Sequence, residues 1–229
     1  MARRTTGRVL RWHVEHIPRI PIGKAKRWIQ PSRQSYTIQD MKTHYWQVLR
    51  RVTVYDSPWV RIHRDDIRLP DGSLIDGHHV VDVPRPAVGV IPVGDDGRIL
   101  LIEHYRFITK TIGWEIPAGG IDPSETAEAA AARELLEETG HRAEAFQFLG
   151  QYHPSNGLSN QTFHVYIGNG ISRCGEITDT NEVSRIGWFT PTEVAEMLRA
   201  NAIRDGFSLT GLLWFFFKVT MEGKKEKPE

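Results

Sequence analysis

One stretch of the chain, residues 119–141, constrains the fold more than any other. It reads GGIDPSETAEAAAARELLEETGH, and its middle consists mostly of alanine, leucine, glutamate and arginine, which are strong helix formers. Asp122, Pro123 and Glu125 have the spacing of a capping box with proline at the first helical position. Gly140 is placed to end the helix in a left-handed conformation. The stretch therefore predicts a helix that begins at Asp122 and ends at Gly140.

The glutamates of this helix point to its chemistry. Glu134, Glu137 and Glu138 are three and four positions apart, so their carboxylates share one helix face near the C-terminal end. They repel one another, and the negative end of the helix dipole adds to the cost. A hard divalent cation removes both penalties, because Mg²⁺ takes carboxylate oxygens and shares its other positions with water and phosphates. The alternative is a solvated acidic helix in which Arg133 pairs with Glu137.

Length and composition set the class of protein. A chain of 229 residues can form one domain of ordinary size with an extension, and 40% hydrophobic and 25% charged residues are typical of a soluble globular protein. Cys174 is the single cysteine, which excludes an internal disulfide and favours the cytoplasm. The longest apolar run, residues 212–217, is too short to cross a bilayer, so we expect no membrane association.

Basic residues are concentrated in residues 1–40, which hold nine arginines and lysines against two acidic residues. Three interpretations are open: an arm that touches nucleic acid or anionic surfaces, an organelle-targeting segment, or translated sequence upstream of the true start at Met41. We favour a disordered arm without a catalytic role, because it shows no sustained helical or strand periodicity. Nucleic acid is therefore not the expected partner.

Runs of β-branched and aromatic residues predict strands in the rest of the chain. Residues 46–55, 59–69 and 75–83 are broken by turn residues and predict a small antiparallel meander. Continuously apolar runs at 87–93 and 99–105 predict central strands covered on both faces. Further elements follow: strands near 114–117, 146–152, 162–167 and 184–189, a helix that opens at 190–193 and a last helix over about 209–219. This order predicts a mixed sheet between helices.

The stretch with which we began has the spacing G-x5-E-x7-R-E-U-x-E-E-x-G-U, where U is aliphatic, and only His141 departs from it. This spacing resembles that of the Nudix hydrolases. The segments LIEHYR at 101–106, EIPAG at 115–119 and NGLSN at 156–160 are similar to the ADP-sugar pyrophosphatase branch of that family.

The resemblance implies a fold and a domain order. The fold is the α/β/α sandwich with a mixed β-sheet, preceded by a small N-terminal antiparallel β-sheet that commonly builds a homodimer. We therefore expect an arm over residues 1–40, a dimerisation sheet over 41–84, the catalytic domain over 85–220 and a disordered tail over 221–229.

The resemblance also implies a metal site for Mg²⁺ or Mn²⁺. Its ligands are the carbonyl of Ala118 and the carboxylates of Glu134 and Glu138, with Glu137 as a further ligand where several ions bind. Arg133 is expected to orient Glu137 through a charge-assisted hydrogen bond. Glu125 of the spacing pattern is explained equally well by helix capping and by function.

Substrate contacts implied by the resemblance come from two other segments. Arg106 matches an arginine that contacts phosphates, since a guanidinium suits bidentate phosphate binding. Glu115 is expected near a sugar or base, and Gly119 beside the substrate. Ser155 and Asn156 lie in the loop expected to face the helix. Amides at positions 160 and 161 stand where some relatives have an acidic residue.

The spacing pattern of residues 119–141 does not identify the catalytic base. Relatives have an acidic residue in the loop before the strand near 184–189, where this chain reads TDTNEVSRIGWF. Glu182 is the favoured base, and Asp179 is the second choice. A signature glutamate, Glu137 or Glu138, is the remaining choice.

The implied reaction is hydrolysis of a nucleotide sugar, with ADP-ribose cleaved to AMP and ribose 5-phosphate. Another nucleotide sugar or a dinucleotide is the alternative substrate. A catalytically silent Nudix module that senses a nucleotide is a different class, against which the intact set of glutamates argues. A third class, nucleic-acid processing such as decapping, is favoured only by the basic arm.

Overall fold

The computed structural model describes residues 45–222, which divide into two compact units, residues 45–82 and residues 83–222. The predicted basic arm, residues 1–40, lies outside the described residues, and so does the tail after residue 222. Among the described residues, no helix is both long and apolar enough to cross a membrane.

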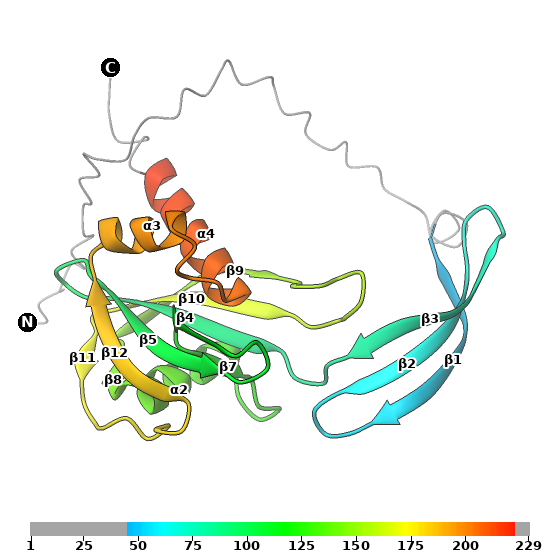
Figure 1. The fold of residues 1–229 in the computed structure, drawn as a ribbon, viewed down its shortest axis with the longest axis horizontal. Coiled ribbons are helices and arrows are strands. Elements are labelled where there is room, and N and C mark those ends of the chain that lie inside the picture. The colour runs from blue at the N-terminus through cyan, green and yellow to red at the C-terminus, as the bar shows by residue number, and fades with distance from the viewer. Residues whose placement is uncertain (1–44, 223–229) are drawn as a thin grey trace, which may run out of the picture. The chain divides into compact units, whose positions relative to one another are not determined.

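The first unit is a three-stranded antiparallel sheet, shown in blue to cyan in Figure 1. Its strands follow chain order: β1 (Gln47–Asp56), β2 (Arg61–Arg68) and β3 (Leu74–Asp82). An ion pair crosses from β1 to β2, where Arg51 donates to the buried Asp65 over 2.7 Å. That hydrogen bond lowers the pKa of Asp65 below its ordinary value. The predicted small N-terminal sheet is confirmed.

The second unit is built on a seven-stranded sheet, whose central order is β12 (Val183–Phe189), β5 (Ile99–Arg106), β4 (Ala87–Val93), β10 (Phe163–Asn169) and β9 (Ala145–Tyr152). Strand β10 runs parallel to β4, and its other neighbour β9 is antiparallel, so the predicted mixed sheet is confirmed. Two short strands that the sequence did not predict, β8 (His141–Arg142) and β11 (Ser172–Arg173), pair with each other. The remaining two strands of the large sheet are β6 (Thr111–Glu115) and β7 (Ala118–Gly120).

The centre of this sheet is split, and the split positions the site. Strands β4 and β5 pair only at Val93 and Ile99, beyond which β7 pairs with β4 and β6 pairs with β5. The single short strand predicted near 114–117 is therefore wrong, because two strands occupy this region with a break at Ile116 and Pro117. Proline has no N–H to give to a ladder, and here its carbonyl accepts from Val90 over 2.9 Å. After this break the chain re-enters the sheet as β7, so the first residues of the stretch 119–141 lie in the sheet.

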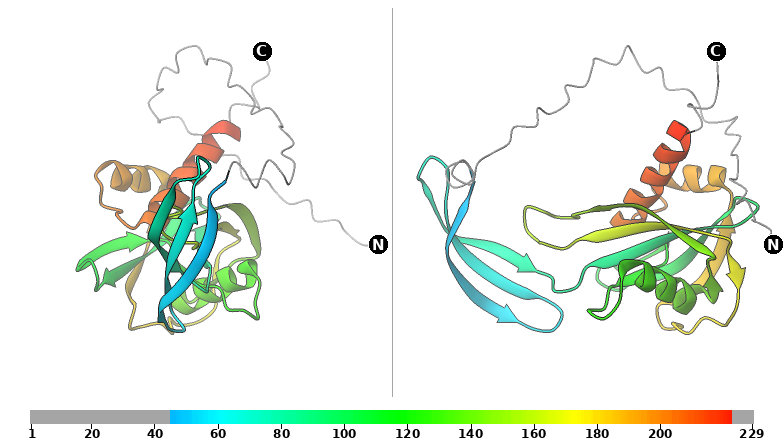
Figure 2. Two further views of the ribbon diagram at one scale, coloured as in Figure 1. Left: turned by 90° about the vertical axis from the view of Figure 1, so that its right-hand side faces the viewer. Right: turned by 180° about the vertical axis from the view of Figure 1, so that it is seen from behind.

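Helices cover both faces of this sheet (Figures 1 and 2). Helix α2 (Ala127–Thr139) packs on one face, and α3 (Pro191–Arg199) and α4 (Gly206–Glu222) pack on the other. Alternate residues of β4 serve the two layers, since Val88 and Val90 face α2 while Ile91 joins the core under α4. The predicted α/β/α sandwich is confirmed, and β4 and β5 are its doubly covered central strands.

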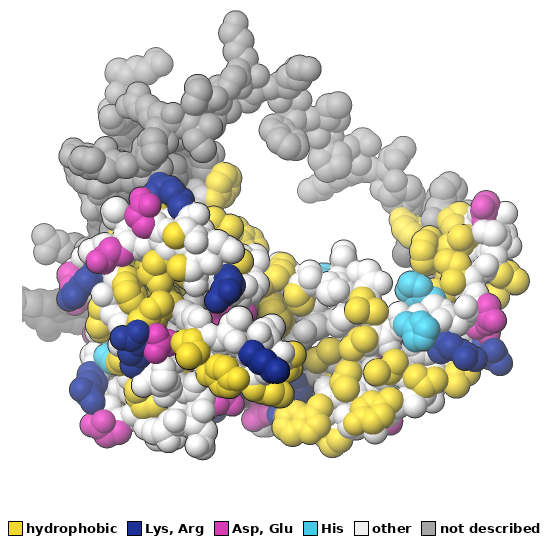
Figure 3. All heavy atoms as spheres, viewed as in Figure 1, with side chains coloured by type: hydrophobic (Ala, Val, Ile, Leu, Met, Phe, Trp, Pro, Cys, Tyr) yellow, Lys and Arg dark blue, Asp and Glu magenta, His cyan; other side chains and the backbone are white. Residues whose placement is uncertain are grey.

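The first unit exposes large hydrophobic side chains along β1. Val48 is 55% exposed, Val54 56% and Tyr55 54%, and Trp59 in the following turn is 77% exposed. Hydrophobic side chains gather on this sheet in Figure 3. Contiguous exposed apolar surface of this kind usually marks an interaction site.

Candidate active site

Helix α2 begins later than the sequence predicts, with Thr126 as its N-cap. The Thr126 hydroxyl accepts a hydrogen bond from the Ala129 N–H over 3.1 Å. Asp122 and Glu125 form a separate turn, in which the Asp122 N–H donates to the Glu125 carboxylate over 2.9 Å. The predicted start at Asp122 is wrong, because its side chain pairs with Arg85 over 2.9 Å and a second good N-cap residue follows.

Arg133 gathers the carboxylates of α2. Its guanidinium donates to Glu125 and to Glu134 over 2.7 Å each, and to Glu137 over 3.1 Å. It also donates to the carbonyl of Gly120 over 2.9 Å. Hydrogen bonding, to Glu125 first, raises the pKa of Arg133 above its ordinary value, so the group stays cationic. The pairing of Arg133 with Glu137 is present, and two further carboxylates share the same guanidinium.

Glu138 is the most deeply buried carboxylate of the cluster, at 2% exposed. Its Oε2 accepts a hydrogen bond from the Ala118 N–H over 2.9 Å. Burial raises its pKa to about 9, and the charges of Glu134, Glu182 and Asp179 add to the shift. Burial also raises the pKa of Glu134. Burial therefore disfavours the charged form of both groups, and a metal cation beside them would oppose this effect.

The donor set fits a hard divalent cation by its chemistry. Among the described residues no three His, Cys, Asp or Glu side chains already stand in a metal-binding arrangement. In the structure Arg133 donates hydrogen bonds to Glu134 and Glu137, and the Ala118 N–H donates to Glu138. All the side chains offer oxygen, two carry raised pKa values, and Mg²⁺ needs only a few protein ligands beside water and phosphate.

Two glycines shape this cluster. A Cβ on Gly119 would lie 2.0 Å from Oε1 of Glu134, so only glycine lets that carboxylate lie over the loop. Gly140 ends α2 with φ of 69°, the left-handed conformation predicted for it. Its carbonyl accepts from the N–H of Cys174 over 2.9 Å, which ties the end of the helix to the next loop.

Arg106 and Glu115, both predicted to contact substrate, pair with each other. Nη2 of Arg106 lies 2.6 Å from Oε2 of Glu115 across the β5–β6 pair. Glu115 is buried, whereas the side chain of Arg106 is 44% exposed. The pair therefore presents part of an anchored guanidinium to solvent, within electrostatic range of Glu138.

The two candidates for the base lie in the loop before β12. The N–H groups of Thr178 and Asp179 donate to the carbonyl of Glu137 over 2.9 and 3.1 Å, which fixes this loop to the end of α2. Asp179 and Glu182 both raise the pKa of Glu138, so the structure brings both acids to the carboxylate cluster.

His104 was not singled out from the sequence. It lies on β5, is 5% exposed, and its Nε2 lies 4.0 Å from Oε2 of Glu182. A signal was present, because His104 lies two residues after Ile102 and so falls on the same strand face as Leu100 and Ile102. Its position beside Glu182 follows from the pairing of β5 with β12, which the sequence did not specify.

Ser155 and Asn156 are not brought to the carboxylates. Both are exposed in the loop between β9 and β10, and in the described part of the chain neither side chain hydrogen-bonds to α2. The Ser155 carbonyl instead accepts from the N–H groups of Leu158 and Ser159 in a turn. Asn160 accepts from the Val83 N–H over 2.9 Å, a structural use of that amide.

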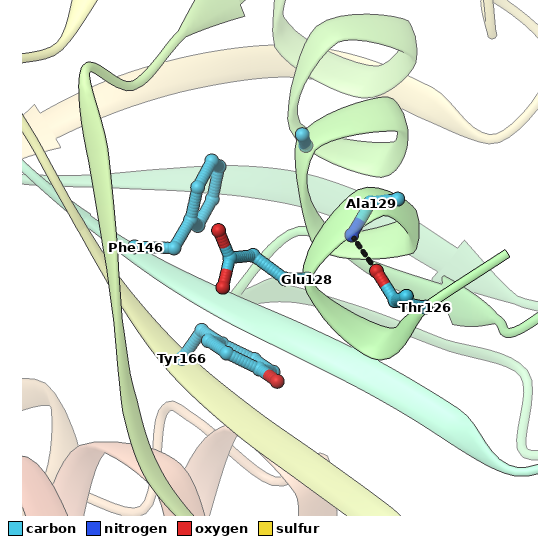
Figure 4. A pocket seen from close by; sticks show the side chains of 6 residues that line it. Thr126, Glu128, Ala129, Phe146 and Tyr166 are labelled. Atoms are coloured by element: carbon cyan, nitrogen blue, oxygen red, sulfur yellow. Dashed lines mark hydrogen bonds between the residues drawn. The ribbon is translucent and has the colours of Figure 1, made fainter.

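A cavity of about 500 Å³ lies on the other side of α2, away from the signature carboxylates. In Figure 4 the Glu128 side chain extends from α2 toward Phe146 and Tyr166. None of the predicted site residues lines this cavity. Its lining residues are Thr126, Glu128, Ala129, Ala132, Phe146 and Tyr166.

Known proteins resemble this chain over most of its length. A CMP-5'-(N-acetyl-N-hydroxy-3-aminopropyl)phosphonate hydrolase of Streptomyces rubellomurinus is 33% identical over 160 residues, 70% of this chain and 77% of that protein. An ADP-ribose pyrophosphatase of Mycobacterium tuberculosis is 27% identical over 76% of this chain and 84% of its own length. A crystal structure of an ADP compounds hydrolase shares the fold, with a TM-score of 0.70, 20% identity, and coverage of 78% of this chain and 96% of that one.

Both units of the structure match family descriptions. Residues 46–81 match the nucleoside diphosphate sugar hydrolase N-terminal domain, and residues 83–208 match the NUDIX domain. The NUDIX match spans more than half of the chain and contains the whole carboxylate cluster of α2. The chain is therefore a member of the Nudix hydrolases that also carries the N-terminal domain of nucleoside diphosphate sugar hydrolases, and it is a hydrolase that acts on a diphosphate.

Proposed function

We propose that this protein hydrolyses the diphosphate of ADP-ribose and releases AMP and ribose 5-phosphate. The observation that carries the proposal is the carboxylate cluster of α2 in a chain whose residues 46–81 match a nucleoside diphosphate sugar hydrolase domain. The similarity to an ADP-ribose pyrophosphatase supports the choice of sugar. Hydrolysis of such a substrate needs a neutralised diphosphate, a positioned water and a base.

We propose Mg²⁺ as the metal, with Mn²⁺ as the alternative. The carbonyl of Ala118 and the carboxylates of Glu134, Glu137 and Glu138 would hold it. When bound, a divalent ion neutralises diphosphate oxygens and lowers the pKa of a coordinated water. The donor chemistry supports this, because a cation beside Glu134 and Glu138 reverses the effect of burial on their pKa values.

We propose that the remaining residues of the site either position other side chains or contact the substrate. Arg133 orients Glu137 while it also holds Glu125, through hydrogen bonds of 3.1 and 2.7 Å. Arg106 contacts substrate phosphate, and the buried Glu115 holds its guanidinium in place. Gly119 lets the substrate approach the backbone of the loop. Ser155 and Asn156 are proposed to contact the substrate from the loop between β9 and β10.

Glu182 is the proposed general base. Its side chain is 55% exposed, so it can reach an attacking water, and it lies close enough to Glu138 to affect that group's pKa. A positioned base contributes about 10²-fold to 10⁴-fold to turnover, so Glu182→Gln should lower kcat by that order. Asp179→Asn is the matched variant in the same loop. A silent Glu182→Gln beside an inactive Asp179→Asn would move the assignment to Asp179.

A second substrate class is favoured by one specific observation. The relative that is 33% identical acts, by its name, on a CMP-linked phosphonate. Such a compound shares with ADP-ribose an anhydride bond from a nucleoside monophosphate to a second phosphorus. The carboxylate cluster would serve either anhydride. The contacts that the protein makes with the nucleobase and with the leaving group would differ between the two substrates.

We also propose that the protein is a homodimer that forms through β1. Val48, Val52 and Val54 of β1 are exposed to between 37% and 56%, although the strand is rich in apolar residues. A second copy of the same sheet would remove these side chains from water, which is favourable in proportion to the apolar area buried. The other side of β1 from β2 is a free strand edge within the described first unit.

A substrate panel tests the proposal directly. Purified protein is incubated with ADP-ribose, a CMP-linked phosphonate, a dinucleotide and ATP, each with Mg²⁺, Mn²⁺ or EDTA, and products are separated by chromatography. We expect AMP and ribose 5-phosphate from ADP-ribose with the highest kcat/KM, and no turnover in EDTA. Glu134→Gln provides the inactive control. Faster cleavage of the CMP compound would favour the second class, and turnover in EDTA would reject the metal.

A further inference from the structure

His104 is a buried polar side chain to which the proposed reaction assigns no role. It lies on β5 two residues after the buried apolar run from Ile99 to Ile102, and it is only 5% exposed. Its Nδ1 is buried and has no hydrogen-bond partner within the described part of the chain. A buried ring nitrogen without a partner is uncommon in folded proteins and calls for an explanation.

The missing partner identifies the tautomer of this ring. Burial lowers the pKa of His104, so the imidazole is neutral and carries a single N–H. If the hydrogen were on Nδ1, a buried donor would lack an acceptor, which costs more than an unused lone pair. The hydrogen therefore resides on Nε2, the nitrogen that lies 4.0 Å from Oε2 of Glu182.

The sheet places this N–H beside Glu182 for structural reasons. His104 lies opposite Val183 in the register of β5 and β12. The next residues are clamped to β5, because Ser184 and Arg185 donate to Glu103 over 2.9 and 2.7 Å. The backbone around Glu182 is thus held at one end by the sheet, while its side chain, 55% exposed, remains free to turn.

The other charged groups near His104 do not compete for its N–H. The carboxylate of Glu115 already accepts a hydrogen bond of 2.6 Å from Arg106. Asp179 is near enough for its charge to raise the pKa of His104, but the described residues include no hydrogen bond or ion pair between the two. Glu182 is the acid that the structure places within ion-pair distance of Nε2.

We propose that His104 is a positioning residue, whose Nε2–H donates to the carboxylate of Glu182 and aims its second oxygen at the attacking water. This inference depends on the proposed role of Glu182 as base. Hydrogen bonds in active sites are often long before substrate binds and shorten in the complex, and rotation of the Glu182 side chain closes the 4.0 Å separation. One oxygen accepts the N–H, and the lone pairs of the other remain free to take the proton.

Three substitutions of His104 separate this role from simple packing. Glutamine places its amide N–H near the position of Nε2, asparagine places it near Nδ1, and leucine offers no donor. We expect His104→Gln to keep kcat close to that of the wild-type protein. His104→Asn and His104→Leu should lower kcat about 10-fold to 100-fold with little change in KM. Thermal unfolding of each variant checks that it is folded. If His104→Leu does not fold, the comparison of His104→Asn with His104→Gln still tests the role.

A double-mutant cycle with Glu182→Gln completes the experiment. If His104 acts through Glu182, His104→Asn should cause no further loss of kcat in the Glu182→Gln background. Multiplicative losses, or full activity of His104→Asn, would overturn the inference while leaving Glu182 as the base. A Glu182→Gln variant with wild-type kcat would instead reject the proposed base, and this inference with it. The substrate is whichever compound of the panel the wild-type protein cleaves.

Discussion

Glu138 is a buried carboxyl group that the proposed reaction requires as an anion. Burial raises its pKa from its ordinary value of 4.5 to about 9. Above pH 4.5 the unfolded chain releases this proton while the folded protein keeps it, so unfolding becomes easier as the pH rises. The free energy of unfolding of the metal-free protein should fall by about 1.4 kcal/mol per pH unit from this group, and the fall should end near the folded pKa.

Glu138→Gln should remove that slope and abolish activity. We expect the metal-free variant to be more stable than the wild-type protein at about pH 8, with a difference that shrinks toward about pH 5. Urea unfolding in EDTA at both pH values measures this, and the substrate assay with Mg²⁺ measures the loss of turnover. An active Glu138→Gln would exclude this carboxylate as a metal ligand.

Gly119 and Gly120 form a matched pair for testing the close approach of Glu134. A Cβ on Gly119 would lie 2.0 Å from the Glu134 carboxylate, whereas a Cβ on Gly120 would meet nothing within 4 Å. The atom in the way is the end of a flexible side chain, so the carboxylate should move and the backbone should stay. We expect Gly119→Ala to lower affinity for the divalent metal about 10-fold to 100-fold, with little change in Tm.

Gly120→Ala should leave metal affinity unchanged. Titration of Mn²⁺ into both variants, followed by calorimetry, makes the comparison. Equal affinity in the two variants would mean that the position of the Glu134 carboxylate over Gly119 has no part in metal binding.

At the scale of elements, the N-terminus of α2 shows why helix starts are hard to predict. Two residues with capping side chains, Asp122 and Thr126, precede the same alanine-rich run. Thr126 is used because Arg133 reaches back to Glu125 and Gly120, which bends the preceding residues into a loop. That contact spans up to 13 residues and has no local signal.

Thr126→Ala should therefore destabilise the protein by about 0.5–2 kcal/mol, the usual cost of removing an N-cap. Asp122→Ala removes only an ion pair with Arg85 in which both side chains are about half exposed, so it should cost less, about 0–1 kcal/mol. Urea unfolding of the two variants at neutral pH gives both values. If Asp122→Ala destabilised the protein more than Thr126→Ala, Asp122 rather than Thr126 would be the N-cap.

At the scale of the whole molecule, the exposed apolar strand β1 carries the prediction of a dimer. Val54→Asp places a charge on a side chain that is 56% exposed and would be buried by a second copy. Leu213→Asp is the matched control, because Leu213 is 57% exposed on α4, outside the proposed interface. Light scattering should give a dimer for the wild-type protein and for Leu213→Asp, and a monomer for Val54→Asp. A wild-type monomer would reject the proposed dimer.

The elements that local patterns describe well could be predicted from the sequence. Apolar runs gave β4 and β5, and Gly140 marked the end of α2. The last helix begins at Gly206, earlier than the predicted residue 209, because Asp205 accepts from the Ser208 N–H over 2.7 Å. Split strands β6 and β7 were missed, since their pairing depends on partners distant in sequence.

The sequence by itself determined the spacing of the signature glutamates, and hence the family, the helix and the shared face of its carboxylates. These follow from local rules, because residues three and four positions apart meet on any helix. Tertiary structure alone decided which carboxylates are buried, that Arg106 and Glu115 pair, and that His104 lies beside Glu182. Burial and strand register arise when distant segments pack together, and no local pattern specifies which segments meet.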